Sequence, residues 1–221
     1  MLKSGFHRSV REPLPEAWGD SLVALRNRGN SLKYRTAEAV TCVSTEPMHA
    51  WQLCGIEGRG VMARQWDSKA FDATYARWLS DGSFPFGTAE YYTRYRSRYK
   101  ALLKRFSQLA PAEPVDVLDV GGGQLALLAS KMWNDRCSVS ELPGEPQLEY
   151  LRTFGIRPVV WNLCKQEQPC VAAFDFIFFS EVIEHLPIPG YLPLRLLRKA
   201  LRPGGILICS TPNMPRTIPK S

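Results

Sequence analysis

The sequence predicts an α/β fold with a doubly wound, mostly parallel sheet covered by helices. Three observations predict it. From about residue 113 onward, short apolar runs alternate with helical segments, and the connections between them are brief. The run Phe174-Asp-Phe-Ile-Phe-Phe179 is almost wholly apolar, as in a strand covered on both faces. The first run of this region ends in three glycines, Gly121-Gly-Gly123, directly before a helical segment.

The elements of this region follow one another regularly along the chain. Because strands bounded by turn residues alternate with helices, the pattern indicates βαβ units and a parallel sheet. Strands are expected at residues 115–120, 137–140, 157–161, 174–179 and 206–211. Helices are expected at residues 124–133, 146–154 and 191–201.

Two helices are expected upstream. Aromatic residues recur at helical spacing from residue 66 to 78, and glycines at 82 and 87 bound a break. A second helix is expected over residues 88–109, with an apolar stripe of Tyr91, Tyr95, Tyr99, Leu102 and Phe106. Six basic residues crowd its other surface. Its tyrosines could cover a ligand while arginines face an acidic substrate or RNA, but packing and a solvated charged face are more typical.

The bulk properties fit one α/β domain with an extension. The 221 residues divide into an N-terminal extension of unknown structure (1–65), a helical cap segment (66–112) and a core (113–221). The net charge of +7 permits an acidic or nucleic-acid partner without requiring one. Six cysteines without C-x-x-C spacing and no export signal predict reduced thiols in a cytoplasmic protein, and no apolar run suggests a membrane span.

Acidic residues accompany the glycine turn. Asp119 stands just before it, and the third glycine of the dinucleotide fingerprint is absent. A pyrophosphate gains nothing from a neighbouring carboxylate, whereas a cationic amino-acid end does. Glu141 ends the second strand 22 residues later, where a carboxylate can bind both ribose hydroxyls. Together they predict a site for a nucleoside without phosphates; the alternative is that both are ordinary surface acids at loop ends.

Three motifs then carry a family resemblance. Val117-Leu-Asp-Val-Gly-Gly-Gly-Gln124, Phe174-Asp-Phe-Ile-Phe-Phe-Ser-Glu-Val-Ile-Glu-His-Leu186 and Leu201-Arg-Pro-Gly-Gly-Ile-Leu-Ile208 resemble the first, fourth-strand and fifth-strand motifs of class I S-adenosylmethionine-dependent methyltransferases. They occur in the family's order over residues 113–213. The similarity is strongest to the type 11/12 group that contains the ubiquinone-biosynthesis O-methyltransferases. The resemblance implies a Rossmann-like fold, S-adenosylmethionine as cofactor and S-adenosylhomocysteine as product.

The resemblance also implies a set of cofactor-binding residues at the ends of four strands: Asp119, Gly121, Gly122, Gly123, Gln124, Glu141, Leu142, Asn162, Leu163, Ser180 and Glu181. Asp119, Gly121 and Gly123 are expected to line the methionine end, Glu141 to bind the ribose and Leu142 to pack beside the adenine. Asn162 stands where relatives often have an aspartate that contacts the adenine amine, so it keeps an acceptor but loses the charge. Ser180 and Glu181 border the place where methyl group and acceptor meet.

His185 is the candidate catalytic base, because a hydroxyl acceptor must lose a proton. A second interpretation places a divalent metal on Glu181, Glu184 and His185, which resemble the Glu-x-x-Glu-His cluster of the small-RNA 2′-O-methyltransferases. That cluster is completed by a downstream histidine, which this chain lacks, so no metal is expected. In a third interpretation these residues merely shape the loop after the fourth strand.

The family's sheet normally has seven strands, and the last two form an antiparallel hairpin. The proline-rich residues after 211 are too few to build it, so the core looks C-terminally short. The strand at 206–211 is then expected to be an exposed apolar edge, which favours a homodimer or a partner chain that covers it.

Three functions remain open. The first is S-adenosylmethionine-dependent O-methylation of a small-molecule acceptor. The second is a degenerate or truncated relative that binds cofactor or partners without turnover. The third is RNA methylation, suggested by the net charge and the basic helix.

Overall fold

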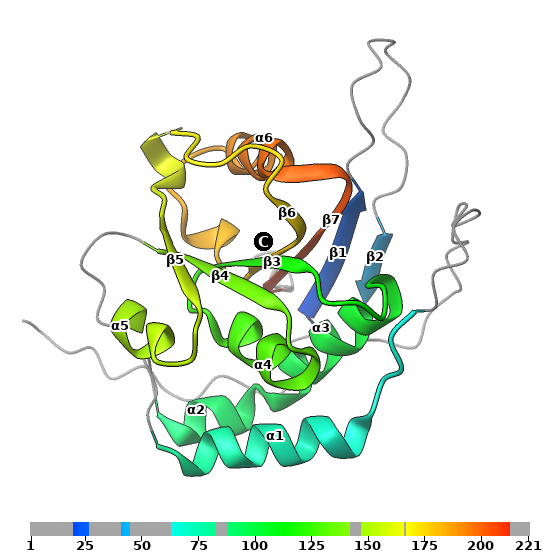
Figure 1. Cartoon of the computed structure of the whole chain (residues 1–221). Helices are drawn as coiled ribbons and strands as arrows, with labels where there is room; N and C mark the ends of the chain where they lie inside the picture. Colours follow the sequence, from blue (N-terminus) through cyan, green and yellow to red (C-terminus); the bar gives the residue numbers. More distant parts are fainter. Residues whose placement is uncertain are drawn as a thin grey trace, which may run out of the picture.

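The computed structural model describes the chain over residues 20–26, 41–44, 63–82, 88–141, 147–165 and 167–212. Its centre is a seven-stranded sheet in the order β2-β1-β7-β6-β3-β4-β5 (Figure 1). The strands are β1 (Asp20–Arg26), β2 (Thr41–Ser44), β3 (Asp116–Val120), β4 (Arg136–Glu141), β5 (Arg157–Val160), β6 (Phe174–Ser180) and β7 (Leu201–Pro212). The five strands β3 to β7 pair in parallel, which confirms the predicted fold class.

The edge of β7 is covered by the chain's own N-terminal segment. β1 pairs antiparallel with β7 from Asp20 opposite Pro212 to Arg26 opposite Ile206, and β2 pairs antiparallel with β1. The expectation that residues 206–211 form an exposed edge is therefore wrong. The expected dimer or partner chain over that edge loses its structural basis, because strands from another part of the sequence complete the sheet.

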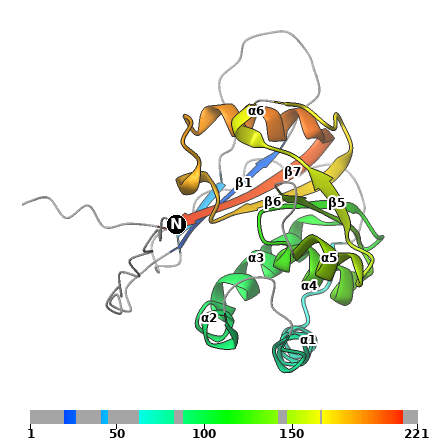
Figure 2. The same cartoon turned by 90° about the vertical axis from the view of Figure 1, so that its left-hand side faces the viewer.

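Helices cover both faces of the parallel strands. They are α1 (Ser68–Ser80), α2 (Ala89–Arg94), α3 (Arg96–Leu109), α4 (Gln124–Trp133), α5 (Gln147–Arg152) and α6 (Tyr191–Ala200). Figure 2 shows α6 on one face, α3, α4 and α5 against the other, and α1 and α2 as an outer layer beneath them. The expected core helices therefore lie where the pattern indicated, with ends shifted by a few residues.

Alternation along β6 explains the two layers. Side chains on a strand point to opposite faces in turn, so Phe176 and Phe178 pack toward α3 and α4, whereas Ile177 and Phe179 pack toward α6. All four are buried. Phe106 of α3 completes the first layer with ring centroids 4.9 Å from Phe176. This burial on both faces is what the apolar run in the sequence predicts.

The prediction of a single helix over residues 88–109 is wrong in one respect, because the helix breaks at Tyr95. Thr88 caps α2 by accepting a hydrogen bond from the Tyr91 N–H, and Tyr95 has φ −97° and ψ 12°, outside the helical region. The break shifts the stripe, so that Tyr92 is fully buried and Tyr91 is 43% exposed. Tyr99, Leu102 and Phe106 are buried as expected, so this face of α3 packs into the core.

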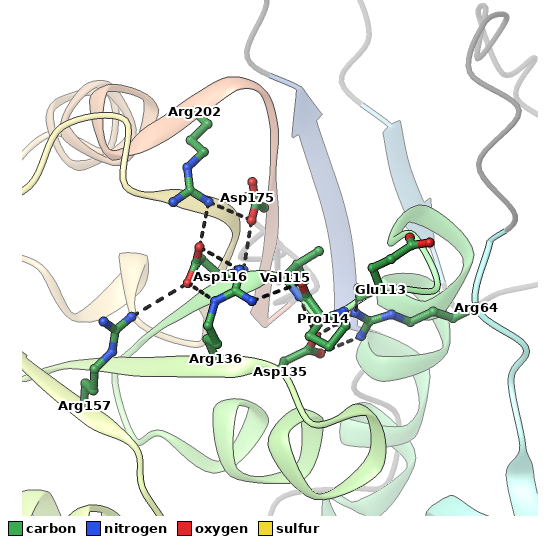
Figure 3. A network of polar contacts seen from close by, with 10 residues as sticks. All are labelled: Arg64, Glu113, Pro114, Val115, Asp116, Asp135, Arg136, Arg157, Asp175 and Arg202. Atoms are coloured by element: carbon green, nitrogen blue, oxygen red, sulfur yellow. Dashed lines mark hydrogen bonds and ion pairs between the residues drawn. The ribbon is translucent and has the colours of Figure 1, made fainter.

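Ion pairs join the amino ends of the parallel strands (Figure 3). Asp116 at the start of β3 accepts hydrogen bonds from Arg136 of β4 and from Arg202 of β7, and Arg202 also bonds Asp175 of β6. The hydrogen bond from Arg136 lowers the pKa of Asp116. Because these acids and bases neutralise one another, we assign this edge to holding the strands in register.

In the described part of the chain, none of the helices combines the length and apolarity that crossing a membrane requires. The four cysteines whose side chains are described, Cys137, Cys164, Cys170 and Cys209, form no disulfide with one another.

Candidate functional site at the carboxyl edge of the sheet

The carboxyl ends of the parallel strands meet at the edge opposite the ion pairs. From β3 the chain winds outward to β4 and β5 on one side, and then returns to β6 and β7 on the other. The switch point therefore lies between β3 and β6. In open α/β sheets, ligands bind outside the carboxyl ends of the strands at such a point. The residues after β3 and after β6 are thus the first candidates for a binding site.

The glycine turn after β3 is compact and has no room for side chains. The Gly121 N–H donates a hydrogen bond to the Ser140 carbonyl of β4 (3.1 Å), and Gly121 has φ +115°. A Cβ on Gly121 would stand 2.8 Å from Cγ2 of Val182, which follows β6. Gly123 has φ +77° and precedes the first residue of α4, Gln124. The turn therefore connects both halves of the sheet at the switch point.

Asp119 supports this turn from within. Its Oδ2 accepts hydrogen bonds from the backbone N–H groups of Leu125 (2.9 Å) and Ala126 (3.1 Å) in the first turn of α4. These donors have no partner inside the helix, so the carboxylate caps it from outside. Burial raises the pKa of Asp119 to about 6. A place at the methionine end of a cofactor stays a prediction; the contact that the structure gives Asp119 is with α4.

The residues expected on the ribose and adenine side lie at the ends of β4 and β5. Glu141, whose backbone alone is described, is the last residue of β4 and pairs with Val160 of β5. Leu142 lies outside the described residues. Asn162 follows β5, and its Oδ1 accepts a hydrogen bond from the Cys164 N–H (3.0 Å). Leu163 begins the 3-10 turn η1 (Leu163–Lys165) and is buried on the α6 side of the sheet.

Of these expected residues, some stand at the carboxyl edge and others are engaged in local structure or in the core. Glu141 stands at the carboxyl edge as the sequence predicts. The acceptor oxygen of Asn162 is engaged in a local turn, and Leu163 belongs to the core. A contact of either residue with an adenine stays a prediction.

Ser180 and Glu181 join a cluster of polar side chains at the ends of β6 and β7. The hydroxyls of Ser180 and Ser210 are 2.7 Å apart, and Ser210 donates a hydrogen bond to Oε1 of Glu181 (2.9 Å). Ser210 is buried. Glu181 has φ +55°, a left-handed conformation that is uncommon outside glycine. Ser210 lies within β7, in the continuation of the fifth-strand motif, but it was not among the expected site residues.

Arg98 of α3 is a site residue that the sequence did not single out within its basic run. Its Nη1 lies 3.2 Å from Oε2 of Glu181, and its side chain is only 8% exposed. The guanidinium stacks over the ring of Tyr95 at 4.4 Å. Among the described residues, none accepts a hydrogen bond from its Nε. A buried donor without an acceptor is costly, so this Nε fits an anionic group of a ligand.

The helices before the core also reach the glycine turn. Nε2 of Gln124 donates a hydrogen bond to the hydroxyl of Tyr92 in α2 (2.9 Å), and the hydroxyl of Tyr75 in α1 donates to the Tyr92 carbonyl (2.7 Å). The tyrosine next to the turn is thus Tyr92, which lies outside the stripe expected from the sequence. Gln124, which was expected to bind the cofactor, is oriented by this hydrogen bond.

His185 stands apart from this polar cluster. It ends the 3-10 turn η2 (Ile183–His185), and its side chain is 77% exposed. Glu181 is bound to Arg98 and Ser210, whereas Glu184 accepts a hydrogen bond from Thr211 (3.3 Å). Within the described ranges, no three acidic, histidine or cysteine side chains gather in a way that would hold a metal ion. A role of His185 as base stays a prediction.

A family model described as "Methyltransferase domain" matches residues 91–219, which is more than half of the chain. The comparison with curated protein sequences gave no significant match.

Several solved structures are similar to the chain at low identity. A protein from Galdieria sulphuraria, proposed to be a sarcosine dimethylglycine methyltransferase, is 15% identical with a TM-score of 0.48, and the match covers 65% of this chain and 60% of that one. An S-adenosylmethionine-dependent methyltransferase from Thermotoga maritima, proposed to act on histamine, is 19% identical with a TM-score of 0.40, covering 63% and 57%. The 1,6-didemethyltoxoflavin-N1-methyltransferase of Burkholderia thailandensis, solved with its substrate and S-adenosylhomocysteine, is 19% identical with a TM-score of 0.40, covering 67% and 66%.

The chain thus spans about three fifths of the length of the first of these proteins. The finer resemblance to ubiquinone-biosynthesis O-methyltransferases stays a prediction. The resemblance to class I S-adenosylmethionine-dependent methyltransferases is confirmed at the level of the family, and the chain belongs to the methyltransferase-domain family.

Proposed function

We propose that the chain binds S-adenosylmethionine at the carboxyl edge of the sheet and transfers its methyl group to a small-molecule acceptor. One observation carries the proposal. A turn without side chains stands at the switch point between β3 and β6, and the buried Arg98, with an Nε that no described residue uses, is paired with the residue that follows β6. Membership of the methyltransferase-domain family supports it.

The glycine turn and the end of β4 would contact different parts of the cofactor. Gly121, Gly122 and Gly123 let the ligand approach the backbone, because no Cβ intervenes. Glu141 binds the ribose hydroxyls from the end of β4. When bound, the sulfonium cofactor supplies the reactive methyl group, so the protein chiefly aligns donor and acceptor and excludes water.

We place the acceptor beside the cluster of Ser180, Ser210 and Glu181, and propose that it is a hydroxyl compound. Ser210 gives its proton to Glu181, so the Ser180 hydroxyl donates to Ser210 and keeps oxygen lone pairs that can accept a hydrogen bond from such a group. The RNA alternative gains little support from α3, because Arg96 and Lys100 pair with Asp72 and Arg98 is buried.

Calorimetry on the full chain tests cofactor binding. We expect S-adenosylhomocysteine to bind, and ATP and NADH not to bind. Glu141→Gln is expected to weaken S-adenosylhomocysteine at least about tenfold, since it removes a charged acceptor from two hydroxyls. Glu149→Gln is the matched control, because its carboxylate is exposed and pairs only with Arg152 among the described contacts. Equal affinity in all three proteins would refute the assignment of the pocket.

Turnover is tested separately with isotopically labelled S-adenosylmethionine and parallel panels of phenols, catechols and amines. Methyl transfer to hydroxyl compounds alone supports the proposed acceptor class. Transfer to amines alone contradicts the acceptor class and leaves the cofactor assignment intact. Binding without turnover on any panel favours the non-catalytic alternative.

A further inference from the structure

We propose that Leu22 of β1 borders the methyl acceptor and limits the size of the hydroxyl compound that fits beside Ser180. The inference rests on the proposed function, which places the acceptor at the ends of β6 and β7. It concerns the N-terminal segment, to which the sequence gave no task. The family model matches residues 91–219, so β1 lies outside the part of the chain that the family describes.

Leu22 shares a row with two serines of the polar cluster across three neighbouring strands. Ser180 of β6 lies opposite Ser210 of β7, and Ser210 lies opposite Leu22 of β1, the strand beside β7 in Figure 1. Residues that oppose one another in a sheet project to the same face. The hydroxyls of Ser180 and Ser210 follow this rule, since they are 2.7 Å apart. The backbone alone is described for Leu22, and its register assigns it to the same row.

This row stands at the carboxyl edge of the sheet. Ser180 is the last residue of β6, and β7 ends two residues after Ser210, at Pro212. Because β1 runs antiparallel to β7, its first residue, Asp20, lies opposite Pro212. The beginning of the N-terminal strand thus reaches the same edge as the ends of the parallel strands, level with the two serines.

The row combines one hydrogen-bonding group with an apolar residue. Ser210 is buried and gives its proton to Glu181, so Ser180 donates to Ser210 and can accept from the hydroxyl of the methyl acceptor. Leucine has no polar atom with which to hold that hydroxyl. Ser180 would therefore bind the reacting group, while Leu22 admits or excludes the rest of the compound by its size.

Val23 distinguishes this role from plain packing of β1. It follows Leu22 in the strand and lies opposite Cys209, which packs on the α6 side of the sheet. Since neighbouring residues of a strand project to opposite faces, Val23 belongs to the face without the serines. A packing role would change the stability at either position and the choice of acceptor at neither. A place beside the acceptor changes that choice at Leu22 alone.

The experiment measures kcat/KM of the full chain for phenol and for the bulkier 1-naphthol at saturating S-adenosylmethionine. Leu22→Ala makes room beside Ser180 and is expected to raise the ratio of 1-naphthol to phenol about tenfold, whereas Leu22→Phe is expected to lower it about tenfold. Val23→Ala is the matched control and is expected to leave the ratio within about twofold. Calorimetry is expected to give the same affinity for S-adenosylhomocysteine in all three variants.

A second measurement does not depend on turnover. Leu22→Cys is alkylated with iodoacetamide in the reduced protein, and peptide mass spectrometry gives the rate at position 22. With S-adenosylhomocysteine bound, 1-naphthol is expected to slow this alkylation severalfold. The same compound is expected to leave the alkylation of Val23→Cys unchanged, because position 23 belongs to the other face. This measurement and Leu22→Phe decide the question if Leu22→Ala does not fold.

The outcomes separate the inference from the proposed function. An unchanged ratio in the Leu22 variants of an active chain overturns the inference and leaves the proposed function intact. Equal protection of Leu22→Cys and Val23→Cys overturns it too, because the ligand would then tighten the whole strand. Protection at position 22 alone without any turnover supports the inference and favours the non-catalytic alternative. Neither turnover nor protection with either compound contradicts the proposed acceptor class, and this inference with it.

Discussion

Gly123 faces Leu151 where α4 begins, and a Cβ on the glycine would overlap Cδ1 of that leucine. Leu151, in α5, is fully buried, and Val139 of β4 closes the same space with a Cγ2 that would stand 3.1 Å from the added atom. The backbone at Gly123 is also left-handed, with φ +77°. The turn that we assign to the cofactor is therefore fixed by packing even before a ligand is considered.

Gly123→Ala is expected to lower the free energy of unfolding by about 2–4 kcal/mol, which combines the left-handed backbone with an overfilled core. Gly155→Ala is the control, because Gly155 has a similar φ of +73° with nothing within 4 Å of an added Cβ. It is expected to cost about 1 kcal/mol. Urea unfolding of both variants measures the difference. Equal losses would mean that Leu151 moves aside freely.

Asp119→Asn is expected to stabilise the ligand-free protein at neutral pH. Burial raises the pKa of Asp119 to about 6, above the ~4 of a free aspartate. Between these values the folded chain keeps a proton that the unfolded chain has lost, so the stability of the unaltered protein falls as the pH rises through this window. An asparagine oxygen still accepts the bonds from Leu125 and Ala126, and no charge is buried.

Thermal unfolding from pH 4 to 8 checks this. The variant is expected to exceed the unaltered protein by on the order of 2 kcal/mol at pH 7.5 and to match it near pH 4. Asp72→Asn, at a partly exposed position, is expected to show no gain of that kind. A variant that is less stable at pH 7.5 would show that the charge of Asp119 is needed by α4.

Arg64→Met is expected to cost about 3–5 kcal/mol, because it leaves Asp135 buried without its partner. Arg64 donates to both oxygens of Asp135 and to the Glu113 carbonyl (Figure 3). It also donates to the Pro111 carbonyl, so it ties the segment before α1 to the start of β4. Urea unfolding measures the loss.

Arg152→Met is the control for this change, since it breaks an exposed pair with Glu149 and is expected to cost less than about 0.5 kcal/mol. Arg64→Met combined with Asp135→Asn should recover part of the loss, because no unpaired carboxylate remains. Equal stability of Arg64→Met and Arg152→Met would contradict the buried clamp.

Val23→Cys is expected to form a disulfide within the chain on mild oxidation. Val23 stands opposite Cys209 of β7 and Cys42 of β2. Residues that oppose one another in antiparallel strands have Cα atoms about 4.5–5.5 Å apart, a distance that a disulfide spans. Peptide mapping by mass spectrometry of dilute protein identifies the bond. Leu22→Cys is the control, because it opposes Val43 and Ser210; cross-linking of both variants to the same cysteine would contradict the register.

The sequence predicted the core of the fold because its signals there are local. The alternation around β6, the glycine turn before Gln124 and the spacing of Glu141 each depend on neighbours along the chain, and the strands lie where these patterns indicate. The pairing of β1 with β7 joins segments about 180 residues apart. Nothing in either segment records its partner, so the sheet's completion by the N-terminal segment could not be anticipated.

The candidate site also contains parts that the sequence predicts and parts that it does not. The ends of β3, β4 and β6 were predictable, because parallel strands bring their carboxyl ends to one edge. The pair of Arg98 and Glu181 was not, since it joins a helix to a residue about 80 positions later in the chain. Arg98 lies in a run of basic residues, and the sequence alone does not distinguish it from the others. Only the packing of the folded chain shows that it is buried.

The most direct test of the central claim is a crystal of the full chain soaked with S-adenosylhomocysteine. We expect density for the nucleoside outside the carboxyl ends of β3 and β4, with the ribose at Glu141 and the amino-acid carboxylate at Arg98. Density at another part of the surface, or a carboxyl edge that binds ADP in the same soak series and leaves S-adenosylhomocysteine out, would contradict it.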